Sequence, residues 1–80
     1  MTPVSSRARI IGANIRRIRT TRGMTRKALG IAIGHKNGGY ISQVESGLRK
    51  PMDTTLERIA EALGTDTGAL NRHYPKGESE

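Results

Sequence analysis

The chain contains no cysteine, phenylalanine or tryptophan, and only two tyrosines among its 80 residues. Without cysteine there is no disulfide framework, no thiolate zinc site and no thiol nucleophile, so apolar packing must stabilise the fold. No apolar run approaches the roughly 18 residues needed to span a bilayer, and the N-terminus lacks the order of a signal peptide. We therefore expect no membrane association and a location in the reducing cytoplasm.

Acidic residues are scarce in the first 50 positions, where eleven lysines and arginines accompany a single acid, Glu45. Residues 51–80 carry three basic and six acidic side chains, so the net charge of +7 divides into +10 and −3. This asymmetry predicts one face that attracts polyanions, which is typical of nucleic-acid-binding proteins. The alternative is a basic surface that is merely solvated.

The length suits one small domain, because single cores usually come in units of roughly 100 to 200 residues. A two-domain enzyme is excluded. With 34% hydrophobic and 26% charged residues, the chain is too apolar to be wholly disordered. We expect a flexible arm at residues 1–6, a folded domain at residues 7–72 and a C-terminal tail at residues 73–80.

Apolar residues recur at helical spacing in four segments, and a short last turn, capped by Asp66, is anchored by Leu70. No segment alternates with the period of two that is typical of a strand. The pattern predicts an all-α fold, a compact bundle of about five short helices, with each apolar stripe facing inward. The four stripes are Ile11, Ile15 and Ile18; Ala28, Leu29, Ala32 and Ile33; Ile41, Val44 and Leu48; and Leu56, Ile59, Ala60 and Leu63.

Residues 25–46 have the organisation of a helix-turn-helix, in which two short helices are joined by a glycine-bearing turn. Thr25 supplies a hydroxyl that caps the first of these helices. Gly30 lies in the middle of that helix, where it costs about 1 kcal/mol of helix propensity relative to alanine. A glycine at this position predicts that the second helix crosses the first closely there.

Several separate motifs follow one another along the chain: Ile15-Arg16-x-Ile18-Arg19-x-x-Arg22-Gly23-Met24-Thr25, Ala28-Leu29, Gly34, Tyr40-Ile41-Ser42-Gln43-Val44-Glu45-Ser46-Gly47, Pro51, Leu56, Ile59-Ala60, Leu63-Gly64 and Leu70. Over residues 8–72 the chain thereby resembles the Cro and phage-repressor type of helix-turn-helix domain, the XRE-like family. The resemblance implies a lambda-repressor-like bundle that places its third helix in the major groove of DNA, usually as a two-fold dimer. Arg26 departs from the glutamine that is usual in the family, Gly30 replaces the usual alanine, and the turn before Ile41 is one residue longer.

The resemblance also implies a structural role for Glu45. In similar domains the positions of Arg19 and Glu45 form a partly buried salt bridge that ties the first helix to the recognition helix. A carboxylate beside DNA is repelled by the phosphates, so Glu45 either turns inward to an arginine or accepts a hydrogen bond from a cytosine amine.

The outward side of the third helix and the turn before it hold the candidates for DNA contact. Asn37 and Gln43 carry amides able to pair bidentately with adenine, Ser42 is able to bond several bases, and Gly39 lies beside them. Tyr40 either packs in the core or lays its hydroxyl against a phosphate. The predicted phosphate contacts, which position the protein without specifying sequence, are Arg26, Lys27, Lys36, Gly38, Tyr40, Ser46, Arg49 and Lys50.

Catalysis finds little support in the sequence. The two histidines, His35 and His73, have no neighbouring cysteine and no metal-ligand spacing. There is also no phosphate-cradling loop and no dinucleotide-binding fingerprint. We therefore expect neither an enzyme nor a cofactor or metal site.

Together these observations predict a sequence-specific regulator of transcription that binds double-stranded DNA, a repressor acting as a homodimer on an inverted repeat. Two alternatives stay open: an antitoxin-like or other protein-binding module whose DNA binding is secondary, and a non-specific DNA-packaging protein. The ratio of specific to non-specific affinity separates them, because a regulator needs about 10³ or more. Candidates for the dimer surface, each equally suited to the core, are Leu56, Leu63, Thr67, Leu70 and Tyr74.

Overall fold

The computed structural model describes residues 6–72, and over that range it contains five helices and no strand. The predicted all-α bundle is therefore confirmed. Ser6, assigned above to the arm, is the first residue of a helix, whereas the rest of the arm and the tail at residues 73–80 lie outside the described residues. The helices are α1 (Ser6–Thr21), α2 (Arg26–Ala32), α3 (Gly39–Glu45), α4 (Asp53–Leu63) and α5 (Thr67–Asn71).

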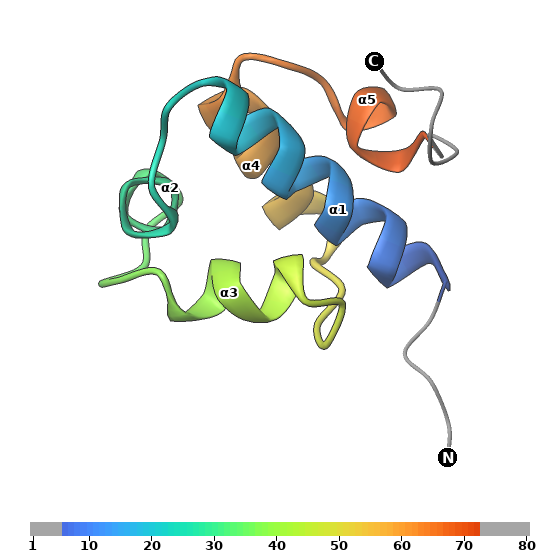
Figure 1. Ribbon diagram of the computed structural model, residues 1–80, viewed down its shortest axis with the longest axis horizontal. Coiled ribbons are helices and arrows are strands. Elements are labelled where there is room, and N and C mark those ends of the chain that lie inside the picture. The colour runs from blue at the N-terminus through green and yellow to red at the C-terminus, as the bar shows by residue number, and fades with distance from the viewer. Residues whose placement is uncertain (1–5, 73–80) are drawn as a thin grey trace.

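Helix α1 is the central element of the bundle. It packs against α3 on one side, α5 on the other and α4 behind it, while α2 contacts α3 and α4 at the far end of the molecule (Figure 1). Within residues 6–72 no helix combines the length and the apolar character needed to cross a membrane. The core draws on every helix, and its most deeply buried large side chains are Ile11, Ile15, Leu29, Ile41, Val44, Ile59, Leu63 and Leu70.

The sequence-predicted stripes are buried with three exceptions. Leu29 of α2 and the C-cap residue Ile33 are buried, but Ala28 and Ala32 are exposed, because so short a helix turns only a narrow face to the core. Leu48 is 72% exposed, so the prediction that it points inward is wrong. The physical reason is the way α3 ends.

Helix α3 is terminated by Gly47, which lies two residues after Glu45 and adopts a positive φ of 83°. The Leu48 N–H donates to the Gln43 carbonyl oxygen at 3.0 Å and the Gly47 N–H to the Val44 carbonyl oxygen at 3.1 Å, which is the Schellman type of helix end. The chain reverses there, so Leu48 no longer follows the helical period. Helices α1, α2 and α4 also end at glycines with positive φ.

Two side chains cap helix starts as the sequence predicts. The Thr25 hydroxyl oxygen accepts a hydrogen bond from the Ala28 N–H at 2.9 Å, and an Asp66 carboxylate oxygen accepts one from the Ala69 N–H at 2.9 Å. Each bond satisfies one of the backbone donors that a helix leaves unpaired in its first turn.

Glycine permits the backbones of the bundle to approach closely at two points. A Cβ atom on Gly30 would lie 2.1 Å from the carbonyl oxygen of Asn37, and one on Gly12 would lie 2.2 Å from that of Val44. The close approach expected at Gly30 is therefore present, although the partner is the turn before α3 rather than α3 itself. Gly12 does the same for the crossing of α1 and α3.

Three of the candidates for a dimer surface belong to the core. Leu56, Leu63 and Leu70 are all buried within the single chain. They are therefore not available for contact with a second copy. Thr67 is partly exposed, and Tyr74 lies outside the described residues.

Candidate nucleic-acid interface

Helix α3 has one buried and one exposed side. Ile41 and Val44 are fully buried against the core, whereas Ser42, Gln43 and Ser46 are exposed. The helix lies along one edge of the molecule, where its outward side is free of other described helices (Figure 1). The two buried aliphatic residues thus fix which side chains α3 presents to a ligand.

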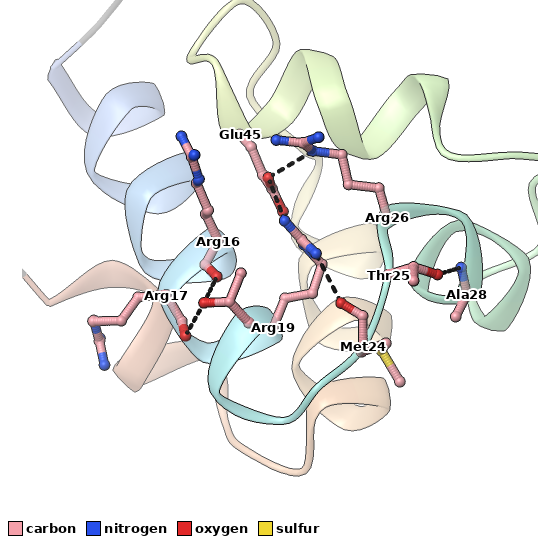
Figure 2. Close-up of polar contacts among 9 residues, drawn as sticks. Arg16, Arg17, Arg19, Met24, Thr25, Arg26, Ala28 and Glu45 are labelled. Atoms are coloured by element: carbon pink, nitrogen blue, oxygen red, sulfur yellow. Dashed lines mark hydrogen bonds and ion pairs between the residues drawn. The ribbon is translucent and has the colours of Figure 1, made fainter.

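Glu45, at the end of α3, turns inward to α1. Its carboxylate oxygens lie 2.6 Å from the Arg19 Nε and 3.2 Å from the Arg19 Nη2, and the exposed fractions of the Arg19 and Glu45 side chains are 9% and 3% (Figure 2). The Arg19 Nη1 also donates to the Met24 carbonyl oxygen at 2.7 Å. The ion pair implied by the family resemblance is therefore present, and the only acid of the basic half is withdrawn from the surface.

Arg26 joins this cluster from the start of α2. Its Nε donates to a Glu45 carboxylate oxygen at 3.0 Å, while 45% of its side chain remains exposed (Figure 2). Glu45 consequently connects α1, α2 and α3, and the two guanidinium groups leave the cluster with an excess positive charge. The sequence predicted Arg26 only as a phosphate contact and did not predict that it pairs with Glu45.

The two amides predicted to read adenine are both engaged within the chain. The Asn37 Oδ1 accepts a hydrogen bond from the Gly39 N–H at 2.9 Å, and the Gln43 Oε1 accepts one from the Arg49 Nε at 2.9 Å. A backbone N–H and a guanidinium N–H can only donate a hydrogen bond. In each amide the bonded atom is therefore the oxygen, and this fixes which way the amide group points. Both residues stay exposed, so their contact with bases remains a prediction.

Tyr40 is part of an aromatic stack that the sequence did not predict. Its ring lies parallel to the His35 ring, with 4.5 Å between the centroids, and the Arg49 guanidinium carbon lies 5.6 Å from the Tyr40 centroid. The ring also packs against the hydrophobic core. Burial raises the pKa of the Tyr40 hydroxyl, and the positive charge of Arg49 acts in the opposite direction.

The remaining predicted phosphate contacts differ in their local bonds. The Ser46 hydroxyl donates to the Gln43 carbonyl oxygen at 3.0 Å. A Cβ atom on Gly38 would lie 2.9 Å from backbone atoms of Arg26 and Lys27, so Gly38 packs directly on the start of α2. The exposed basic side chains, whose contact with phosphate stays a prediction, are Lys27, Lys36, Arg49 and Lys50.

Asn14 and Arg7 have structural roles that sequence reasoning missed. Asn14 is 4% exposed, and its Nδ2 donates to the carbonyl oxygens of Leu70 at 2.8 Å and Arg72 at 2.7 Å. Arg7 donates through Nη1 to the Asn71 carbonyl oxygen. Helix α1 thereby satisfies the carbonyls at the end of α5. The available signal was the position of Asn14, a polar residue directly beside Ile15 and three residues after Ile11.

The described residues offer no metal centre. Among residues 6–72 no group of three or more histidine, cysteine, aspartate or glutamate side chains could hold a metal ion.

Comparison with known proteins decides the family. Residues 15–70 match the helix-turn-helix family model of the Cro and phage-repressor type. The chain belongs to this helix-turn-helix family. Helices α2 and α3 are thus its two defining helices, and α3 stands in the position of the recognition helix. No functionally curated protein matches the chain in sequence.

Two solved structures of regulators share the fold. The clp gene regulator ClgR from Corynebacterium glutamicum is 26% identical, with a TM-score of 0.77 and 88% of each chain covered. The restriction-modification controller protein C.AhdI from Aeromonas hydrophila is 24% identical, with a TM-score of 0.76, and the match covers 82% of this chain and 98% of that one.

A similar helical unit also occurs within an enzyme. Hydroxypropylphosphonic acid epoxidase from S. wedmorenis is 26% identical with a TM-score of 0.77, and the match covers 84% of this chain but only 35% of that one. The shared part is about a third of the enzyme chain, so the likeness concerns the helix-turn-helix unit. The family and the two regulators point to DNA binding rather than to catalysis.

Proposed function

We propose that this chain is a cytoplasmic, sequence-specific transcriptional regulator that inserts α3 into the major groove of double-stranded DNA. The observation that carries the proposal is the two-sided character of α3, which buries Ile41 and Val44 and exposes Ser42 and Gln43. The major groove, about 12 Å wide, admits one α-helix, and hydroxyl and amide side chains at that depth distinguish base edges.

The distribution of charge supports the same surface as the one that binds DNA. Exposed lysines and arginines lie on α2, in the turn before α3 and in the loop after it. These positions flank the exposed side of α3, where the phosphate backbones pass on either side of a groove. Because Arg19 and Arg26 neutralise Glu45, no carboxylate of the first 50 residues opposes this attraction.

The proposed regulatory role is repression of transcription. A gene regulator and a controller protein share the fold at similar length, which supports control of transcription. One recognition helix contacts only a few base pairs, so we propose that a homodimer binds an inverted repeat and represses by occluding the promoter. Two-fold symmetry then places one α3 in each half-site, about one helical turn or roughly 34 Å apart.

Selection of bound duplexes from a random pool tests this function. The purified protein is mixed with the pool at about 150 mM salt, which suppresses purely electrostatic binding. We expect an inverted repeat for the wild type and none for Ser42→Ala/Gln43→Ala, a double variant that keeps every charge. Recovery of no consensus by the wild type would contradict the proposal and favour a packaging protein or a protein-binding module. A consensus of a single half-site would contradict the homodimer alone.

A further inference from the structure

Gln43 is held by a second side chain at the interface. The Arg49 Nε, from the loop after α3, donates to the Gln43 Oε1 at 2.9 Å. The Arg49 guanidinium also lies over the Tyr40 ring, which in turn stacks on His35. Cation–π contact and the hydrogen bond therefore hold the guanidinium from two directions. Gln43 is thus one half of a Gln43–Arg49 pair rather than a free amide.

This pair changes the hydrogen-bonding character of Gln43. Guanidinium groups have donors and no acceptor, so the atom that Arg49 engages is the amide oxygen and the unengaged end is the amino group. Bidentate pairing with adenine needs both ends of the amide, because the oxygen accepts from the adenine N6 and the amino group donates to N7. The oxygen keeps a second lone pair, but an adenine amino group using it would lie beside the guanidinium cation and its donors.

We propose that Arg49 switches the base preference of Gln43 from adenine to guanine. Guanine presents two acceptors in the major groove, N7 and O6, whereas adenine presents an acceptor and a donor. The Gln43 amino group and the Arg49 Nη groups together offer donors, which complement the guanine edge. This inference rests on the proposed function, since it requires α3 to lie in the major groove.

The turn before α3 contributes to the same arrangement. His35 lies in that turn and stacks on Tyr40, and Tyr40 lies under Arg49. Tyr40 is partly buried against the core, whereas His35 is exposed, so the Tyr40 ring offers Arg49 an ordered platform. Ordering a flexible side chain before binding reduces the entropy lost on binding. Arg49 and Tyr40 are therefore positioning residues for Gln43, in addition to any phosphate contact by Arg49.

The test uses the full chain and the DNA site recovered by selection. The base pair under Gln43 is identified as the one whose base preference changes most in Gln43→Ala, whether or not a preference remains there. Affinities are then measured for duplexes carrying each of the four bases there, with the wild type, Arg49→Ala and Lys50→Ala. We expect the wild type to prefer guanine over adenine by about 10-fold. Arg49→Ala should reverse this order, and Lys50→Ala should weaken binding to all four duplexes equally.

The double variant Gln43→Ala/Arg49→Ala separates positioning from direct reading by Arg49. If Arg49 acts through Gln43, removing Arg49 has no further effect on base preference once Gln43 is absent. A guanine preference that survives in Gln43→Ala would assign the contact to Arg49 and overturn the inference. A wild-type preference for adenine, or a preference unchanged in Arg49→Ala, would overturn it while leaving the sequence-specific regulator intact. Absence of any consensus would overturn the proposed function as well.

Discussion

Arg19 on α1 and Glu45 on α3 form a two-point ion pair, in which Nε lies 2.6 Å from Oε2 and Nη2 lies 3.2 Å from Oε1. Helix α3 contains only seven residues, and isolated helices shorter than about 12 residues are marginal in water. Helix α3 therefore depends on tertiary contacts of this kind. The ion pair links the orientation of its exposed side to the longest helix of the bundle.

Replacing Glu45 by glutamine should lower the free energy of unfolding by about 3 kcal/mol, because Arg19 then stays buried without a counter-charge. The contribution of Arg26 is smaller, since its exposed side chain is screened by solvent. Urea denaturation measures the difference. Glu57→Gln, at an exposed position of α4, serves as the matched control and should change stability by no more than about 0.5 kcal/mol. Equal stability of Glu45→Gln and the wild type would contradict the structural role of the pair.

Replacing Gly30 by alanine should destabilise the protein even though alanine is the better helix former. The new Cβ would lie 2.1 Å from the Asn37 carbonyl oxygen, so the turn before α3 must move. Overpacking costs about 1–3 kcal/mol, and a contact of 2.1 Å with a backbone atom lies at the severe end of that range, so the cost exceeds the gain of about 1 kcal/mol in helix propensity. Thermal denaturation of Gly39→Ala provides the comparison, because a Cβ there meets only the end of the Asn37 side chain at 3.1 Å. A stabilised Gly30→Ala protein would show that the close approach is absent.

Replacing Asn14 by alanine should loosen α5 from the bundle. The substitution removes the donor that serves the Leu70 and Arg72 carbonyl oxygens, and an unsatisfied buried polar group costs about 1–3 kcal/mol. Hydrogen exchange should show that protection of α5 is lower in Asn14→Ala than in the wild type, while protection of α4 is the same in both. Asn14→Asp places a carboxylate against the same carbonyls and should be at least as damaging. Unchanged protection of α5 in both variants would exclude a capping role for Asn14.

The pKa of Tyr40 predicts a loss of stability in alkali. Burial raises this pKa above its ordinary value, and Arg49 offsets part of the rise. The folded protein thus holds the Tyr40 proton more tightly than the unfolded chain does. This contribution is complete below the ordinary pKa of about 10 and disappears as the pH rises through the raised value. Between the ordinary pKa of about 10 and the raised pKa, the unfolding free energy of the wild type should therefore fall more steeply with pH than that of Tyr40→Phe. Parallel pH profiles would contradict the burial of the hydroxyl.

The sequence predicted the helices well because their signals are local. Thr25 caps α2 through a residue three positions away, and glycines end four of the helices through backbone conformation alone. The sequence did not predict the interior contacts of Asn14, because Leu70 lies 56 residues further along the chain. Such a contact depends on how α1 and α5 pack rather than on any local pattern.

The candidate interface likewise has features that the sequence predicted and features that it did not. The helical period correctly separated the buried Ile41 and Val44 from the exposed side of α3. The bonds among the exposed residues were not predictable, because the turn at Gly47 brings Arg49 back beside Gln43. A side chain assigned to phosphate therefore engages one assigned to bases. The pairing of Arg26 with Glu45 likewise joins α2 to α3 across the turn.

The most direct test of sequence recognition by the exposed side of α3 is a ratio of two affinities. Binding of the wild type to its selected duplex and to a scrambled duplex of equal length is measured at about 150 mM salt. We predict a ratio of about 10³ or more. In Ser42→Ala/Gln43→Ala this ratio should fall at least about tenfold, while affinity for the scrambled duplex stays the same. A wild-type ratio near unity, or an unchanged ratio in the double variant, would contradict recognition of sequence by α3.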